Sequence, residues 1–480
     1  MRVITLITLF AVVWIFFSLS TIYTNSPSPF NSLSGAISGQ YIAVGGFTGS
    51  ALSPLPSVLL LSPEGGLLYQ WVSRGMILSS REINGSFILS GYGGSPGEGV
   101  EGLVLYHDKD KTKSFRLKGS TDIFLSDATY HDGAIMVAGY FAQTPRGDLD
   151  VLVARFNLEG RLLGLRCYGS VDYPDIAKRL IFDGENIMVL GETWAYNVSQ
   201  GDVLLLKVRD DLTLVDSWSI GGAGIDSGED VGVTRNGDYV IVGYTMGGEG
   251  TQGFLLRVSR IGGILWLRGY LSLGETYLKR VYVDPDTGRV YIVGSGVFEE
   301  GRKDPFLLVE DEIEGWIFNE SRLEIVRSEP SLDLTGDIGG KHFFLYYPGG
   351  IIAGSLKGDV AVNYQLSGPS INSTLFLDDT SELSYYSKSI YGWRLLRGVV
   401  KERPCPKIQV VETDPKVSQV SVSTSTVKIE RKAFKREFDP GLALRRILER
   451  NVPLVLLLPV FIVFLLVIYY ALRGSILKRD

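Results

Sequence analysis

The sequence predicts an all-β fold made of repeated units, and three observations support this prediction. An apolar strand that contains glycine recurs along most of the chain. Each copy is preceded by a polar or acidic stretch and followed by two further strand-like segments, which gives four strands in about 50 residues. The composition, with 57 glycines and 11% aromatic residues, suits short strands joined by tight turns. A period of this length predicts a β-propeller of seven blades, and an eighth, partial blade stays open.

The repeated strand is the clearest element. It reads YIAVGG at 41–46, FILSGY at 87–92, IMVAGY at 135–140, IMVLGE at 187–192, YVIVGY at 239–244, VYIVGS at 290–295 and IIAGS at 351–355. The glycines of the seven copies are Gly45, Gly91, Gly139, Gly191, Gly243, Gly294 and Gly354. Because the strand is apolar on both faces, it is expected to pack between neighbouring blades. The glycine is expected to break the strand, at a turn or a close approach of the backbone.

The rest of each unit is a third strand, a turn, and a fourth strand that carries tryptophan. Trp71, Trp218, Trp266 and Trp316 are expected at matching places in the fourth strand, where their rings would fill the gap between blades. The seventh unit is the least regular, since its glycine follows the sixth by 60 residues. Residues 384–400 are apolar enough to pair with the first blade and close the ring.

A glycine-aspartate turn follows the repeated strand in several units, at Gly147-Asp148, Gly201-Asp202 and Gly358-Asp359. With the tryptophan-bearing strand, this pattern resembles the Gly-rich repeats of membrane-anchored or secreted β-propeller surface proteins of archaea and bacteria. The resemblance covers residues 29–380, although Gly253-Phe254 and Asp304-Pro305 depart from it. It implies the architecture and a surface location, and it is silent about activity.

Two apolar runs define the ends of the chain. Val3–Phe17, behind Arg2, predicts a signal peptide or an uncleaved N-terminal anchor over residues 1–24. Val452–Leu472 has 21 residues without a charge and predicts a transmembrane helix. The intervening chain divides into a propeller ectodomain at 29–400 and a basic stalk at 401–450, and residues 473–480 form a short cytoplasmic tail.

The two apolar runs predict opposite orientations of the chain in the membrane. Seven basic residues precede the last apolar run and three follow it, so the positive-inside rule alone would place the stalk in the cytoplasm. An N-terminal signal acts first and sends the propeller outside. We therefore expect a cell-membrane protein, single-pass or anchored at both ends, with an extracytoplasmic propeller. Four glycosylation sequons, at Asn84, Asn197, Asn319 and Asn372, agree with that side.

Charge and cysteine content limit which partners, metal sites and disulfides the sequence can support. Residues 1–400 carry a net charge of −13 and residues 401–480 carry +7. An acidic body argues against nucleic acid, which leaves the membrane and an unknown protein or envelope glycan as expected partners. Two cysteines and three histidines cannot build a usual zinc site. Cys167 and Cys405 are either a disulfide that ties the stalk to the disc or two buried thiols.

Acidic residues gather in turns and at strand starts, and no residue is assigned as catalytic. They are Asp148, Asp150, Asp172, Asp175, Asp202, Asp226, Glu229, Asp230 and Asp359. The expected role is bonding of turn amides, with calcium as the one candidate cofactor. The predicted function is binding, adhesion or scaffolding. The alternatives are an extracytoplasmic enzyme acting on glycans, which would need a carboxylate pair, and a structural part of a surface assembly.

Overall fold

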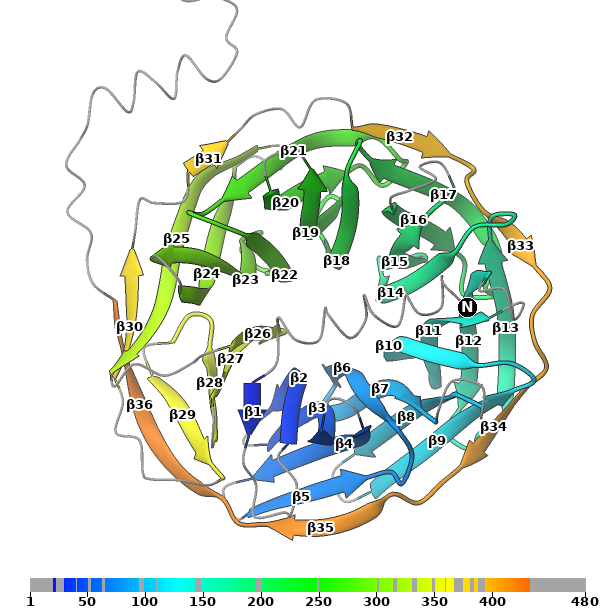
Figure 1. Ribbon diagram of the computed structural model, residues 1–480, viewed down its shortest axis with the longest axis horizontal. Coiled ribbons are helices and arrows are strands. Elements are labelled where there is room, and N and C mark those ends of the chain that lie inside the picture. The colour runs from blue at the N-terminus through cyan, green and yellow to red at the C-terminus, as the bar shows by residue number, and fades with distance from the viewer. Residues whose placement is uncertain are drawn as a thin grey trace, which may run out of the picture. The chain divides into compact units, whose positions relative to one another are not determined.

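The computed structural model is a seven-bladed β-propeller around a central channel (Figure 1). It describes residues 20–22, 30–39, 41–50, 53–62, 65–94, 99–108, 111–142, 148–195, 201–247, 250–299, 302–313, 317–329, 335–347, 350–358, 360–366, 374–379, 384–386 and 393–431. These residues all fall within one compact unit, 1–432. The predicted all-β fold is confirmed, and the blade count is seven.

Each blade has four antiparallel strands in sequence order, and the first strand lies nearest the channel (Figure 1). Blades 1 to 4 contain β2 (Phe30–Ser38), β3 (Tyr41–Ser50), β4 (Ser53–Ser62) and β5 (Gly65–Gln70); β6 (Gly75–Ile83), β7 (Ser86–Gly93), β8 (Glu101–Asp108) and β9 (Lys111–Gly119); β10 (Ile123–His131), β11 (Ala134–Ala142), β12 (Leu149–Asn157) and β13 (Leu162–Gly169); and β14 (Asp175–Phe182), β15 (Ile187–Thr193), β16 (Asp202–Val208) and β17 (Leu214–Gly221). Blades 5 to 7 contain β18 (Ile225–Val233), β19 (Tyr239–Gly247), β20 (Gly250–Val258) and β21 (Ile264–Leu271); β22 (Thr276–Val283), β23 (Val290–Glu299), β24 (Arg302–Ile313) and β25 (Ile317–Glu329); and β26 (Thr335–Gly339), β27 (His342–Tyr347), β28 (Gly350–Ser355) and β29 (Val360–Gln365). A short strand, β1 (Ser20–Ile22), adds to the inner edge of β2.

The C-terminal part of the described chain forms an outer belt that gives every blade a fifth strand (Figure 1). Its strands are β30 (Thr374–Asp379), β31 (Ser384–Tyr386), β32 (Arg394–Arg397), β33 (Lys401–Arg403), β34 (Ile408–Glu412), β35 (Lys416–Val420) and β36 (Ser423–Arg431). They pair in turn with blades 6, 5, 4, 3, 2, 1 and 7, so the belt runs against the order of the blades. It closes on itself, because β36 also pairs in parallel with β30.

The belt corrects two expectations. Residues 401–431 are strands of the propeller, so the predicted stalk does not begin at 401. The segment 384–400 pairs with blades 5 and 4, not with blade 1. Short polar strands such as KVSQV carry little apolar surface and resemble a spacer in sequence. Backbone hydrogen bonds to an exposed sheet edge hold them in place. Such bonds do not require any particular pattern of side chains, so the sequence does not reveal them.

The repeated glycine lies within its strand, opposite a β-bulge in the first strand of the same blade. In blade 3 the register shifts between Leu125 and Asp127, and Gly139 pairs with Leu125. A Cβ at Gly139 would lie 2.0 Å from the carbonyl oxygen of Phe124. The matching residue in blade 1 is Gly46, not Gly45, since a Cβ there would lie 1.9 Å from the carbonyl oxygen of Asn31. Close approach, and not an end of the strand, therefore requires the glycine.

Blade 7 is the unit whose strand assignment from sequence is wrong. Its apolar copy, IIAGS, lies in β28, the third strand, whereas the other six copies lie in second strands. The second strand of blade 7 is β27, HFFLYY, which has no glycine. It pairs with β26 without a bulge, so the steric reason for glycine is missing there. This shift of one strand explains why the spacing between the sixth and seventh glycines is the longest.

The core lies between blades, as the two-sided apolar strands predict. All seven residues of β15 are buried. Met136 and Ala138 of blade 3 pack with Leu180 and Val189 of blade 4. The tryptophans do not hold matching positions: Trp71 follows β5, and Trp218 pairs with Leu205 of blade 4, while Trp266 pairs with Arg257 of blade 5, two residues away in register. Trp316 lies outside the described residues.

Both predicted membrane segments lie outside the described residues, except for Ser20–Ile22, which forms β1. This applies to Val3–Phe17, to Val452–Leu472, and to the expected tail at 473–480. Within the part of the chain that the structure describes, there is no helix with the length and apolar character needed to cross a membrane. The signal or anchor and the transmembrane helix remain predictions from sequence.

Candidate functional site

The channel wall is built from one position in the first strand of each blade. In blades 1 to 6 this position follows the β-bulge, so the extra residue turns the next side chain toward its neighbours around the ring. The residues are Ser34, Ser79, Asp127, Arg179, Asp230 and Arg280, and Asp337 takes the same role in blade 7. Acidic and basic residues alternate along most of this ring.

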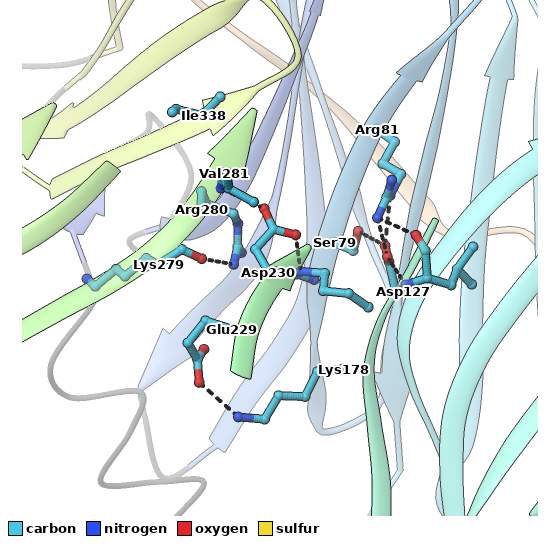
Figure 2. Close-up of polar contacts among 12 residues, drawn as sticks. Ser79, Arg81, Asp127, Lys178, Glu229, Asp230, Lys279, Arg280, Val281 and Ile338 are labelled. Atoms are coloured by element: carbon cyan, nitrogen blue, oxygen red, sulfur yellow. Dashed lines mark hydrogen bonds and ion pairs between the residues drawn. The ribbon is translucent and has the colours of Figure 1, made fainter. Parts of the chain in front are cut away.

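Each aspartate of the ring joins three consecutive blades. Asp127 of blade 3 pairs with Arg81 of blade 2, 3.1 Å from Nε to Oδ1, and its Oδ2 accepts the amide of Leu180 in blade 4 at 2.9 Å (Figure 2). Figure 2 also shows Ser79 donating to the same carboxylate. A carboxylate that is held by an ion pair to the preceding blade and by a backbone amide of the following blade is firmly positioned.

The same geometry repeats in blades 5 and 7. Asp230 of blade 5 lies 3.7 Å from Arg179 Nε and accepts the amide of Val281 at 3.0 Å (Figure 2). Asp337 of blade 7 lies 3.2 Å from Arg280 Nε and accepts the amide of Gly35 at 3.0 Å.

Seven blades cannot alternate two charges completely, and the exception is at blades 1 and 2, whose residues at this position are Ser34 and Ser79. There Ser34 Oγ and Ser80 Oγ lie 2.9 Å apart and join blades 1 and 2 without charge.

Burial and neighbouring charges set the protonation of the ring. At Asp127, burial acts to raise the pKa, but Arg81 and Arg179 outweigh burial and hold it below its usual value. At Asp337, burial prevails over Arg280 and the amide hydrogen bonds, and the pKa is raised. Side-chain hydrogen bonds from Arg81 and Ser79 lower the pKa of Asp127 further.

The bulged residues form a second set beside the ring. They include Lys178, Glu229 and Lys279 in blades 4, 5 and 6. Lys178 Nζ lies 2.9 Å from Glu229 (Figure 2) and 2.6 Å from Glu192. Burial acts to lower the pKa of Lys178, but these two carboxylates outweigh burial and raise the pKa above its ordinary value.

A cavity of about 530 Å³ opens within the channel, lined by residues of the ring and by the strand ends beyond it. Arg179, Asp230, Arg280 and Asp337 contribute its charged wall. An apolar collar adds Ile37, Ile83, Ile181, Val233 and Val283 to the lining. A cavity of this size, with both charged and apolar parts in its wall, can hold a small ligand or the end of a chain segment.

The acidic residues singled out from sequence lie in separate places. Asp148, Asp150 and Asp175 lie at the junction of blades 3 and 4, where Arg403 of the belt lies 3.5 Å from Asp150. Burial, with Asp148, raises the pKa of Asp150 to about 7. Glu229 and Asp230 belong to the channel wall. Asp172 is an exposed loop residue, and Asp359 lies outside the described residues.

Asp202 and Asp226 converge at the junction of blades 4 and 5. A Cβ at Gly221 would lie 2.3 Å from Asp202 Oδ1 and 2.9 Å from Asp226 Oδ2, so only glycine fits between them. Asp226 accepts the amide of Gly222 at 2.6 Å, as Asp175 accepts that of Ser170. Asp226 and Asp175 thus each accept a hydrogen bond from a loop amide. Within the described residues, no group of three or more His, Cys, Asp or Glu side chains could hold a metal ion.

The remaining predicted site residues are placed as follows. Cys167 in β13 and Cys405 in the belt form a disulfide, with their Cα atoms 5.4 Å apart. Asn84 is exposed in the turn between β6 and β7. Asn319 lies within β25, and Asn197 and Asn372 lie outside the described residues.

The sequence analysis did not single out Arg81, Asp127, Arg179, Arg280 or Asp337. A signal for the ring exists: Asp127 and Arg179 each precede the repeated glycine of their blade by 12 residues. Comparison with known proteins adds no family, because no protein-family model matches the chain and no curated protein matches it significantly.

Proposed function

We propose that the protein is a binding module at the cell membrane, with its propeller outside the cytoplasm and its ligand in the channel cavity. The observation that supports this proposal best is the pairing of the cavity wall. A glycan-hydrolysing enzyme needs a carboxylic acid that is free to give and accept a proton. Asp230 and Asp337 in the cavity wall are instead committed, each to an arginine and a backbone amide. Binding uses such fixed groups directly.

The cavity favours an amphipathic ligand. Its collar of Ile37, Ile83, Ile181, Val233 and Val283 can bury an apolar body, while the charged ring can bond a polar end. A segment of a partner protein meets both demands better than an envelope glycan, which offers little apolar surface. The bound part is therefore proposed to be an amphipathic segment of a partner protein.

The membrane location rests on sequence. The uncharged run Val452–Leu472 is long enough to span a bilayer, and the N-terminal run has the character of a signal or anchor. The described chain ends at Arg431 in β36, on the rim of the propeller.

Selective labelling tests the orientation. Intact cells that produce the full chain are treated with a membrane-impermeant amine reagent, and labelled lysines are identified by mass spectrometry. We expect labelling of Lys118 and Lys341, whose side chains are 47% and 60% exposed, and labelling of Lys478 only after permeabilisation. The opposite pattern would overturn the proposed orientation. Extraction of the protein by alkaline carbonate would overturn the membrane anchor.

Site-directed crosslinking tests the binding site. A photo-crosslinking residue replaces Ile83 in the collar or, as a matched control, Leu163 on the rim, which is 50% exposed. In cells producing the full chain, we expect a crosslinked partner from position 83 and none from position 163. The same partner from both positions, or a partner from position 163 alone, would show that the cavity is not the binding site.

A further inference from the structure

Arg179 differs from the other two arginines that line the cavity, Arg81 and Arg280. Arg81 donates to Asp127 from Nε at 3.1 Å and also from Nη2, and Arg280 Nη1 donates to a backbone carbonyl at 3.1 Å. In the part of the chain that the structure describes, the Arg179 guanidinium donates no hydrogen bond. Its ion pair with Asp230 spans 3.7 Å, which is beyond hydrogen-bonding distance.

The carboxylates on either side of Arg179 already have other donors. Asp127, in the preceding blade, accepts hydrogen bonds from Arg81 and from a backbone amide (Figure 2). Asp230, in the following blade, accepts the amide of Val281 at 3.0 Å. Arg179 is only 8% exposed, so its five N–H groups have little to reach except the cavity that it lines. A buried donor group of this kind needs a partner, and a ligand in the cavity can supply it.

The charges around Arg179 leave its positive charge uncompensated. Burial lowers the pKa of Arg179, and Arg280 and Arg81 add to this effect, against Asp127 and Asp230. Burial acts in the same direction on Arg81 and Arg280, but there the carboxylates prevail and the pKa is raised. An anion bound in the cavity would remove the penalty at Arg179.

Apolar surface lies directly beside this cation. Ile181 follows Arg179 by two residues in β14 without an intervening bulge, so both side chains project from the same face of the strand, about 6.6 Å apart along it. Both residues line the cavity, and the rest of the collar extends the apolar surface. A ligand that bonds Arg179 therefore meets apolar surface within one or two residues of its polar group.

We propose that the Arg179 guanidinium binds the C-terminal carboxylate of a partner segment, whose last apolar side chain packs against Ile181. A carboxylate has two oxygens that match the two-pronged donor of a guanidinium. A phosphate dianion would bring a second negative charge close to Asp127 and Asp230, which repel it. A chain end enters the cavity as one strand, whereas an acidic side chain within a segment brings the chain on both sides. This inference rests on the proposed function, because it names the polar end of the amphipathic segment.

Photolabelling with a terminal carboxylate tests the inference. The probe is N-acetyl-photoleucine, in which the free carboxylate stands next to an apolar photoreactive side chain, and the matched control is its uncharged carboxamide. Each is photolysed with the full chain in nanodiscs, and mass spectrometry identifies the labelled residues. We expect the carboxylate to label the collar at least about tenfold more strongly than the carboxamide, because charge-assisted hydrogen bonds are lost with the charge. Labelling of Leu163 on the rim should be equal for both.

Competitors identify the chemistry that is recognised. N-acetylleucine should compete with the probe, whereas inorganic phosphate and acetyl-Leu-Glu-Leu amide, which has only a side-chain carboxylate, should not. Equal labelling of the collar by the two probes, or no labelling of the collar at millimolar probe, would overturn the inference. Competition by phosphate alone, or by the side-chain carboxylate alone, would also overturn it.

Substitutions test whether Arg179 is the receptor. Arg179→Gln should reduce collar labelling by the carboxylate to the level of the carboxamide, and Arg179→Lys, which keeps the charge without the fork, should give an intermediate level. Arg116→Gln is the matched control, because Arg116 pairs with Glu101 away from the cavity, and it should label as the wild type does. Unchanged labelling in a folded Arg179→Gln protein would overturn the inference. If that variant does not fold, Arg179→Lys and the two probes on the wild type decide.

The two proposals fail separately. A partner crosslinked from position 83 without carboxylate-dependent labelling would reject the anion site and keep the proposed function. Carboxylate-dependent labelling of the collar without a crosslinked partner would do the reverse.

Discussion

The amide of Gly35 donates a hydrogen bond of 3.0 Å to Oδ2 of Asp337, and these two residues are 302 positions apart in the sequence. Gly35 belongs to the first blade and Asp337 to the last. This bond, with the ion pair between Asp337 and Arg280, joins blades 6, 7 and 1 at the channel wall. The ring of aspartates and arginines thus closes the propeller from inside, and the belt closes it from outside.

Removal of the Asp337 carboxylate should destabilise the propeller strongly. Asp337→Ala leaves Arg280 without its anion and the Gly35 amide unpaired, so we expect a loss of about 3–5 kcal/mol in the free energy of unfolding. Denaturant unfolding measures the change. The matched control is Asp286→Ala, which removes an exposed pair with Lys341 and should cost at most about 1 kcal/mol. Equal effects of the two changes would contradict the proposed role of the ring.

The disulfide between Cys167 and Cys405 should stabilise the belt. It joins residues separated by 238 positions, and cross-links that close long loops restrict the unfolded chain most. We expect Cys405→Ser to lower the free energy of unfolding by about 3–5 kcal/mol. Reductant should lower the stability of the wild type and leave the variant unchanged. Equal stability of the two proteins under oxidising conditions would contradict the prediction.

The Asp202 and Asp226 pair should make stability depend on pH. Burial raises the pKa of Asp226 to about 6, and Asp202 contributes, against hydrogen bonds from Gly222 and Thr245. A carboxyl group with a raised folded-state pKa favours the fold when protonated, so its contribution is complete below about pH 4 and is lost as the pH rises to about 6. Asp226→Asn should therefore be more stable than the wild type at pH 8, by up to about 3 kcal/mol.

Unfolding of both proteins at pH 4.5, 6 and 8 in the presence of EDTA measures this difference. A constant difference across the three pH values would reject the assignment to Asp226. Calcium provides a second arm, because a cation between Asp202 and Asp226 would raise the melting temperature of the wild type at pH 8 and have no effect on Asp226→Asn.

The glycine opposite each β-bulge should not tolerate a side chain. In Gly139→Ala the new Cβ would lie 2.0 Å from the carbonyl oxygen of Phe124, so the two strands must separate. We expect a loss of about 2–4 kcal/mol, measured by thermal or denaturant unfolding. Gly247→Ala is the control, because a Cβ there meets nothing within 4 Å. A small effect at both positions would show that the bulge can rearrange.

The sequence by itself determined the all-β class, the repeat and six of the seven blade assignments. Apolar runs such as IMVLG are buried on both faces between blades. The side-chain types of a few neighbouring residues are enough to predict such a strand. The glycine at 139 was recognised from sequence as a repeated feature, although its reason, a carbonyl opposite a bulge, concerns a neighbouring strand. The membrane segments and the sequons at Asn197 and Asn372 also come from sequence alone.

Only the tertiary structure decided how the propeller closes. The belt strands, such as Lys416–Val420, pair through backbone groups that every residue carries, so their polar sequence did not distinguish a fifth strand from a stalk. The partners of the channel wall, such as Arg280 and Asp337, come from different blades, and their charges become a ring only when seven first strands converge on one axis.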